Sequence, residues 1–171
     1  MRFFKQGILE ILSCGHWNHP DDYTRLHDET EAYFASNKID GIEVDRPNSE
    51  GYKKKYPLGT CAIIDKDNTH YVLLALTHFD EEDHAYVELS EFGRSISSMC
   101  RYLSDKVGDT PVYMPLMGMG MARLNQPAQF ILKYTLDTIV GIKGLAMLFQ
   151  LSVRRGIITL CSFCGLYHII G

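Results

Sequence analysis

The chain has 171 residues, which suits one domain with a hydrophobic core and is too short for two domains of ordinary size. Apolar residues make up 46% and charged residues 22%, a composition that excludes a disordered chain, a collagen and a coiled coil. The 17 Lys and Arg against 21 Asp and Glu give a net charge of −4, so no positive field favours general binding to DNA or RNA.

The five cysteines are an odd number, which indicates a reducing compartment, and the N-terminus lacks the continuous apolar stretch of a secretory signal. The longest apolar run, Gly156 to Gly171, is shorter than the roughly 20 residues that span a bilayer. We therefore expect a cytoplasmic chain without a transmembrane segment, in which cysteines within apolar runs are free core thiols.

The first third of the chain predicts one clear helix. Phe3 to Leu12 is a short amphipathic piece. Asp22 to Ala35 predicts a helix, because apolar residues recur at spacings of three and four after an acidic pair that can cap its N-terminus. Ser36 to Lys55 is polar and rich in turn formers, which indicates an exposed connection.

A strand hairpin and a second helix are predicted next. Cys61 to Ile64 and Thr69 to Thr77 flank the turn cluster Asp65 to Asn68, and the second run is apolar on both faces, as in a central strand. An acidic loop, His78 to His84, follows. A stripe at spacings of three and four then predicts a helix that lies on a sheet and stops at Gly108. The stripe consists of Leu89, Phe92, Ile96, Met99, Cys100, Leu103 and Val107.

The last clear unit is a strand, a loop and a helix. Thr110 to Met114 predicts a short strand, Pro115 to Asn125 a glycine-containing loop, and Gln126 to Val140 a helix with Pro127 near its first turn. This order predicts an α/β fold with right-handed crossovers and a mostly parallel central sheet. The face expected to be apolar consists of Phe130, Ile131, Tyr134 and Thr138.

Gly118 and Gly120 carry the chemistry of this loop, because they lie between a strand and a helix N-terminus. Backbone N–H groups and the helix dipole attract an anion there, and glycine allows a positive φ and close approach to a phosphate. Arg123 and Asn125 add donors. The loop lacks the Gly-Lys-Ser/Thr of a Walker A motif and the third glycine of the dinucleotide fingerprint, so the pattern alone fits a tight turn about as well as a ligand loop.

Other polar clusters give weaker signals. Cys14 to His19 and Cys161 to His168 contain possible zinc ligands, but neither has the paired spacing of a four-ligand site, so no metal is predicted. The run Asp80 to Asp83 with His84 could act as a general base and is more often a solvated loop. His78 follows an apolar strand, at the end where ligands bind in open α/β sheets, and it fits a buried structural role better than a ligand contact.

Three blocks between Tyr56 and Lys143 form a more specific pattern. They are Tyr56-Pro57-Leu58-Gly59-Thr60; Val72-Leu73-Leu74-Ala75-Leu76-Thr77 with His78-Phe79-Asp80-Glu81 and Ala85-Tyr86; and Val112-Tyr113-Met114-Pro115-Leu116-Met117-Gly118-Met119-Gly120 with Arg123. Together they resemble a macro domain, and more narrowly the macro-domain family of the effector subunit in bacterial Thoeris anti-phage systems. The first and third blocks are the more specific.

The resemblance implies a three-layer α/β sandwich with a mixed, mostly parallel central sheet. It implies no cofactor but a ligand, ADP-ribose or an NAD-derived conjugate, whose diphosphate the glycine-rich loop wraps. In Thoeris systems a partner enzyme with a TIR domain makes an NAD-derived signal, which the macro domain senses. The expected ligand-binding residues are Leu116, Met117, Gly118, Met119, Gly120, Met121, Ala122 and Arg123, and the further candidate contacts are Thr77, His78 and Asn125.

Both ends depart from the family's pattern, so we expect a sandwich that is incomplete there. The first 30 residues lack the opening strand and its Asn- or Asp-bearing loop, and residues 144–171 form an apolar tail in place of a closing edge strand. A truncated or frame-shifted gene and a divergent subtype both explain this. The chain is thus divided into an N-terminal helical segment and connection (1–55), a nucleotide-binding core (56–143) and an atypical tail (144–171).

The resemblance also separates a binding protein from an enzyme. Hydrolytic macro domains show a closely spaced pair of asparagines before the glycine loop, and none lies between Thr60 and Pro115. We therefore predict a sensor of an ADP-ribose-type signal in bacterial antiviral defence, with no catalytic residue. The alternative is a hydrolase that processes ADP-ribose derivatives, and a third hypothesis is a decayed remnant that folds poorly.

Overall fold

The structure is a computed structural model. It describes residues 20–44, 54–66, 69–82, 84–107, 110–120, 122–143, 148–153, 156–161 and 166–170. The amphipathic piece Phe3 to Leu12, the Cys14 to His19 cluster and the side chains of the Cys161 to His168 cluster lie outside the described part of the chain.

Helix α2 spans Pro20–Ser36 and confirms the helix predicted for Asp22 to Ala35. Its buried residues Leu26, Thr30 and Phe34 recur every four positions, which places them on one face. The Thr30 hydroxyl donates a hydrogen bond of 2.6 Å to the Leu26 carbonyl, so this buried polar group is satisfied.

Two short strands lie in the region expected to be an exposed connection. Strand β1 (Ile42–Glu43) pairs antiparallel with β2 (Lys54–Lys55), and the residues of both are exposed. The Lys54 ammonium lies 2.7 Å from the Glu31 carboxylate of α2, and the Tyr56 hydroxyl donates to the same carboxylate at 2.8 Å. Burial, followed by this hydrogen bond, raises the pKa of Tyr56 to about 12.

Strands β3 (Cys61–Lys66) and β4 (Thr69–Leu74) form an antiparallel hairpin, which confirms the predicted strand, turn and strand. The second strand ends at Leu74, three residues before the predicted end at Thr77. Its expected central position is not confirmed, because β4 pairs with β3 alone among the described strands.

The acidic loop is a small hairpin of its own. Strand β5 (His78–Phe79) pairs antiparallel with β6 (Ala85–Tyr86). Helix α3 (Leu89–Val107) follows and matches the predicted stripe. Every stripe position is either buried or packed against the main core cluster.

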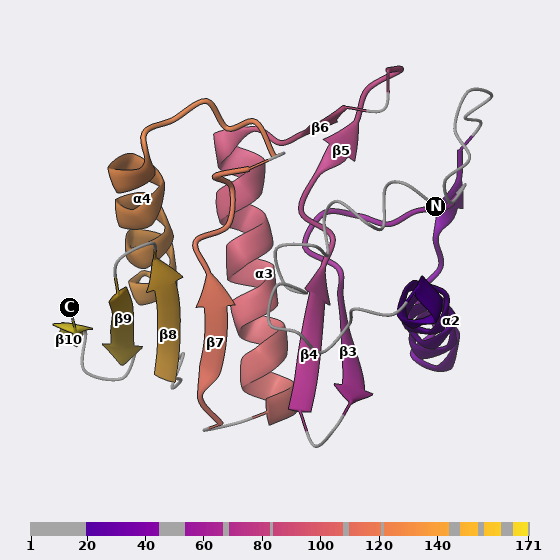
Figure 1. Cartoon of the computed structure of the whole chain (residues 1–171), viewed down its shortest axis with the longest axis horizontal. Helices are drawn as coiled ribbons and strands as arrows, with labels where there is room; N and C mark the ends of the chain where they lie inside the picture. Colours follow the sequence, from indigo (N-terminus) through magenta and orange to yellow (C-terminus); the bar gives the residue numbers. More distant parts are fainter. Residues whose placement is uncertain are drawn as a thin grey trace.

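Helices cover both faces of the β3–β4 hairpin. Because side chains alternate along a strand, Ala62 and Ile64 pack with α2 on one face, whereas Cys61, Val72 and Leu74 share a cluster with α3 on the other. This part of the molecule is therefore a layered helix, sheet and helix arrangement (Figure 1).

Strand β7 (Val112–Pro115) leads through the glycine loop to helix α4 (Ala128–Val140) and then to strand β8 (Leu148–Val153). Strands β7 and β8 are parallel, so this unit is a β-α-β crossover. Strands β9 (Gly156–Cys161) and β10 (Leu166–Ile170) continue the sheet antiparallel, in the order β10-β9-β8-β7. Residues 148–170, expected to form an atypical apolar tail in place of a closing edge strand, thus extend the sheet that carries the glycine loop.

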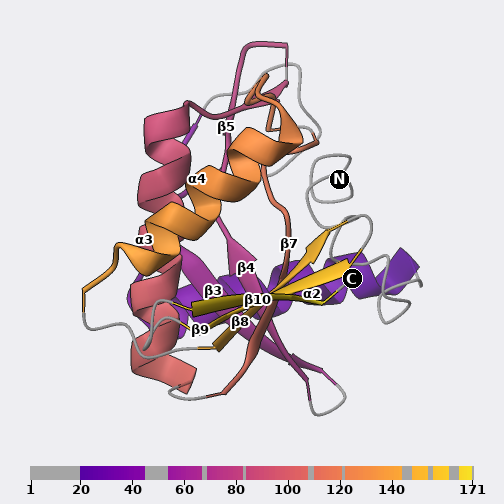
Figure 2. The ribbon, with the colours of Figure 1, turned by 90° about the vertical axis from the view of Figure 1, so that its left-hand side faces the viewer.

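A mostly parallel central sheet is not confirmed. The pair β7 and β8 is parallel, whereas the other pairings among the described strands are antiparallel. Strands β4 and β7 are not joined by a ladder in the described structure. They are linked through side chains instead, because Leu74 of β4 and Met114 of β7 belong to the core cluster of α3. Helices α3 and α4 lie on the same side of these strands (Figure 2).

The buried face of α4 differs from the predicted one. Ile131, Thr135 and Ile139 are its buried residues, whereas Phe130 is 42% exposed. Ile131 is shared by both sets. The two faces are one residue apart in the helix, and Ile131 and Ile139 of the second set belong to the main core cluster.

Candidate functional site

The candidate site lies at one end of the molecule, where several elements meet. The C-terminal ends of β4 and β7 and the N-termini of α3 and α4 all lie at the same end, together with the glycine loop and the β5–β6 hairpin (Figure 1). Ligands of open α/β folds bind outside the carboxyl ends of strands, so the topology presents the loop where a ligand is expected.

Gly118 forms the turn that begins the glycine loop. It has a φ of +86° and is buried. A Cβ at this position would lie 2.5 Å from Leu124 Cδ1 and 3.2 Å from Phe92 Cε2. Only glycine combines this φ with this close packing, so Gly118 serves the core and the turn.

The outer part of the loop is open to solvent. Gly120 is exposed and Met119 is 44% exposed, whereas Leu116 and Met117 are partly buried and pack on the main core. Met121 lies outside the described residues. Of the two glycines that the sequence analysis joined in one phosphate loop, Gly120 is therefore the one that a ligand can approach.

The exit of the loop alternates between core and solvent. Ala122 and Leu124 are buried, whereas Arg123 and Asn125 are exposed and have positive φ angles of 48° and 50°. The Ala122 carbonyl accepts a hydrogen bond of 3.1 Å from the Val87 amide, which fixes the exit against the segment before α3. Left-handed conformations are uncommon for residues other than glycine and cluster at functional sites.

The two helix N-termini at this end differ in charge. In α3, the Glu91 carboxylate of the first turn accepts a hydrogen bond of 3.3 Å from the Glu88 amide, so this terminus already holds an anion. In α4, Pro127 is the N-cap, no side chain caps the terminus, and the first turn has no acidic residue. The N-terminus of α4, which follows the glycine loop directly, is therefore the one suited to bind an external anion.

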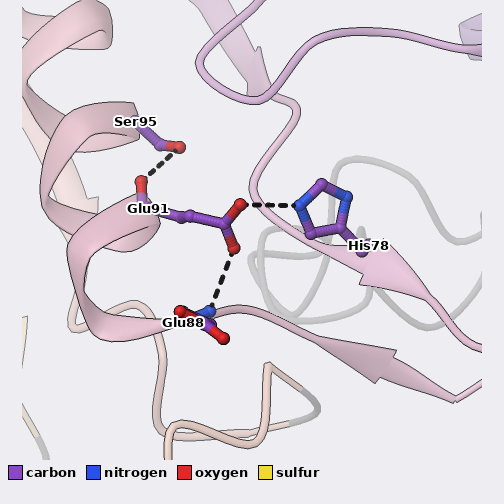
Figure 3. Close-up of polar contacts among 4 residues, drawn as sticks. All are labelled: His78, Glu88, Glu91 and Ser95. Carbon is purple, nitrogen blue, oxygen red and sulfur yellow. Dashed lines mark hydrogen bonds and ion pairs between the residues drawn. The ribbon is translucent and has the colours of Figure 1, made fainter.

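His78 is tied to α3 in this structure. Its Nε2 lies 3.1 Å from Glu91 Oε1, and the two side chains are 20% and 26% exposed (Figure 3). The hydrogen bonds from His78 and from the Glu88 amide hold the pKa of Glu91 below its usual value. The neighbouring Thr77 is partly buried.

Three ionisable side chains, those of Asp80, Glu82 and His84, lie close together in the loop that closes the β5–β6 hairpin. Asp80 Oδ1 accepts hydrogen bonds from the amides of Glu82 and His84 at 3.0 and 2.7 Å, and these bonds lower the pKa of Asp80, the one from His84 most. One ligand atom from each of the three side chains lies within 4.8 Å of the others. The backbone bonds identify Asp80 as the residue that shapes the turn.

A shallow groove of about 560 Å³ lies elsewhere, between α3 and α4. Gly93 of α3 allows Tyr134 of α4 to approach closely, since a Cβ there would lie 2.5 Å from the Tyr134 hydroxyl. The groove is lined by Ser90, Gly93, Arg94, Ser97, Tyr134 and Thr138. None of the predicted ligand-binding residues lines it.

The residues that hold the loop in place were not predicted from the sequence. Phe92 and Leu124 fill the space beside Gly118, Val87 holds the exit of the loop, and Glu91 binds His78. Only Glu91 left a local signal, because a Glu three residues after the N-cap is a capping pattern. The contacts of Phe92 with Gly118 and of Val87 with Ala122 join residues that are far apart in the sequence.

A model of a known protein family matches most of the chain. The family model described as Thoeris protein ThsA, Macro domain, matches residues 17–144. This match takes in α2 and the connection before Tyr56, as well as the three blocks identified by resemblance. A search of curated proteins found no match. Among the described residues, no helix is long and apolar enough to cross a membrane.

Proposed function

The chain belongs to the Thoeris ThsA macro-domain family, and from this premise we propose that it binds an ADP-ribose-type, NAD-derived ligand through the glycine loop, Leu116 to Arg123. The observation that carries the proposal is the open N-terminus of α4. No side chain caps it, it follows the loop directly, and exposed Arg123 and Asn125 stand just before it. Backbone N–H groups, the helix dipole and a guanidinium together favour a diphosphate.

Each part of the loop has a distinct task in this proposal. Gly120 lets the backbone approach the diphosphate, because a glycine has no Cβ to obstruct it. Arg123 donates charge-assisted hydrogen bonds to phosphate oxygens. Gly118 sets the turn from inside the core, and the neighbouring Met119 is exposed.

We further propose that the protein is a sensor in bacterial antiviral defence. The family ties the chain to Thoeris, and a TIR-domain enzyme is the partner that would make the NAD-derived signal. Binding without turnover is the activity that a sensor needs. The odd number of cysteines supports a reducing cytoplasm, where NAD is available.

A hydrolase is the second candidate, and one observation favours it. A half-buried imidazole and carboxylate pair, His78 and Glu91, lies at the same end of the molecule as the glycine loop. Such a pair can orient a base for proton transfer. Turnover of ADP-ribosylated protein is therefore measured alongside binding.

Substitution of Arg123 tests both candidates. Each charge-assisted bond contributes roughly 1.5 to 3 kcal/mol, so Arg123→Ala should weaken ADP-ribose binding about 10- to 100-fold in calorimetry. Arg101→Ala, at an exposed position of α3 outside the site, is the matched control and should bind as wild type. No ADP-ribosylated substrate should be consumed by any of the three proteins.

Two results would overturn the proposal. Wild-type affinity in a folded Arg123→Ala protein would show that the Arg123 guanidinium does not bind the ligand. Multiple turnovers by wild type, with a slower rate but unchanged affinity in Arg123→Ala, would replace the sensor with the hydrolase.

A further inference from the structure

His78 and Glu91 form a contact that joins two elements of the candidate site. His78 begins strand β5, and Glu91 lies in the first turn of α3. Their side chains meet at 3.1 Å and are mostly shielded from solvent (Figure 3). A hydrogen bond to a charged group in such a place is stronger than an exposed one.

The protonation of Glu91 determines which atom donates. The hydrogen bonds from His78 and from the Glu88 amide favour the ionised carboxylate, which can only accept. The Nε2 of His78 must therefore carry the proton in this contact. The bond is thus a donor–acceptor contact of defined direction, which a substitution can remove without removing the volume of the ring.

Glu91 also forms hydrogen bonds within the first turns of α3 and with the residue before it. Its second carboxylate oxygen accepts from the Glu88 amide at 3.3 Å, while its carbonyl accepts from the Ser95 hydroxyl at 2.8 Å. The amide of Val87, one residue earlier, donates to the Ala122 carbonyl of the glycine loop at 3.1 Å. Both Val87 and Ala122 are buried, so this link is shielded from water.

The β5–β6 hairpin provides a second connection between His78 and the segment before α3. In its register His78 lies opposite Tyr86, whose ring centroid is 5.6 Å from that of His78. Tyr86 directly precedes Val87, the residue that holds the loop. His78 is therefore connected to the exit of the glycine loop through two sets of contacts. One includes its hydrogen bond to Glu91, and the other includes its ring contact with Tyr86.

We propose that His78 is a positioning residue, which uses its hydrogen bond to Glu91 to hold the segment before α3, and through Val87 the exit of the glycine loop, in the ligand-binding conformation. The proposal rests on the proposed function, because the ligand it concerns is the diphosphate of ADP-ribose. His78 itself need not touch the ligand. Its effect on affinity is the coupling between this contact and the loop.

Two substitutions separate the hydrogen bond from the packing. His78→Phe keeps a ring beside Tyr86 and removes the donor, whereas His78→Gln keeps an N–H donor and removes the ring. We expect His78→Phe to weaken ADP-ribose binding about five- to tenfold, the lower end of coupling between sites, and His78→Gln to restore most of the loss. In ligand-free protein, His78→Phe should also shift the NMR amide resonances of Gly120 and Ala122, and His78→Gln should return them towards wild type.

The other hairpin offers a matched control. His70 Nδ1 lies 2.5 Å from Asp65 Oδ1, in an exposed pair on β3 and β4 at the opposite end of the molecule (Figure 1). His70→Phe should change neither the affinity nor the loop resonances. If His78→Phe does not fold, His78→Leu takes its place with the same expected outcomes.

The outcomes distinguish this proposal from the function on which it rests. If wild type binds ADP-ribose and His78→Phe binds equally well, His78 has no positioning role and the proposed function stands. Loss of affinity in His78→Gln but not in His78→Phe would assign the effect to packing and also overturn the proposal. If wild type does not bind ADP-ribose, the proposed function fails, and unmoved Gly120 and Ala122 resonances in His78→Phe would overturn this inference separately.

Discussion

Gly118 and Gly120 lie two residues apart in one loop, but they meet opposite surroundings. Gly118 is buried in a left-handed conformation against Phe92 and Leu124. Gly120 is exposed and free to approach a ligand. The structure therefore gives Gly118 a place in the core and leaves Gly120 accessible from solvent, although the sequence pattern treats them alike.

Substitutions at the two glycines should affect different properties: stability at Gly118 and ligand affinity at Gly120. Gly118→Ala places a Cβ 2.5 Å from Leu124 Cδ1 at a φ that alanine disfavours, so it should lower the free energy of unfolding by about 1–3 kcal/mol. Gly120→Val should leave urea denaturation nearly unchanged and abolish ADP-ribose binding in calorimetry. Equal stability of wild type and Gly118→Ala would contradict the packing seen here. Unchanged affinity in a folded Gly120→Val protein would contradict the phosphate-loop assignment.

Cys61 and Cys100 behave as the composition of their segments predicts. Both are free thiols buried in the main core, and burial raises the pKa of each to about 12. Cysteines with so high a pKa are thiols at neutral pH and react slowly. Their role in the described structure is packing, as expected for small apolar side chains.

Among the elements, α3 and α4 show how far periodicity determines a buried face. The stripe of α3 is long and has a hydrophobic majority on one face, so its buried side was predicted correctly. Helix α4 is apolar around more of its surface, so periodicity does not determine whether Phe130 or Ile131 faces the core. Contact with the rest of the molecule placed Ile131 inside and left Phe130 exposed.

Thr135 of α4 gives a prediction about this face. Its side chain is 1% exposed, and its hydroxyl has no hydrogen-bond partner among the described residues. An unsatisfied buried hydroxyl costs about 1–3 kcal/mol, so Thr135→Val should raise the free energy of unfolding by up to about 1 kcal/mol in urea denaturation.

Thr138 is the matched control for Thr135. Its hydroxyl donates to the Tyr134 carbonyl at 2.7 Å, so Thr138→Val removes a made hydrogen bond and should not stabilise. A destabilised Thr135→Val protein would show that the hydroxyl of Thr135 has a partner after all.

At the scale of the whole molecule, strands β8 to β10 decide how the sheet ends. Strand β8 pairs with β7 on one side and β9 on the other, in register from Leu148 opposite Cys161 to Val153 opposite Gly156. Without β9, β8 would be an exposed edge, which favours association with other chains. The C-terminal strands therefore protect the sheet that carries the glycine loop.

Truncation tests this arrangement. Removal of residues 156–171 should lower the thermal midpoint by about 5 °C or more, given that each kcal/mol shifts the midpoint by roughly 2–4 °C at this size, and should reduce solubility. Removal of 162–171 deletes β10 alone and should have a smaller effect. An unchanged midpoint and improved solubility after the longer deletion would show that these strands are not part of the stable fold.

The sequence by itself determined the local elements and the family. The helix predicted at Asp22 to Ala35, the β3–β4 hairpin, α3 and the order of strand, glycine loop and α4 were all predicted, because periodicity, turn residues and caps act over a few neighbouring residues. The three blocks around the loop indicated a macro domain, and the match over residues 17–144 confirmed it.

Only the tertiary structure decided what depends on distant contacts. It placed β8 beside β7, selected the buried face of α4, buried Gly118 while leaving Gly120 exposed, and brought His78 to Glu91. Each of these outcomes depends on which side chains meet after the chain has folded back on itself. Local periodicity carries no information about these tertiary contacts, because strand pairing and side-chain packing depend on the whole core.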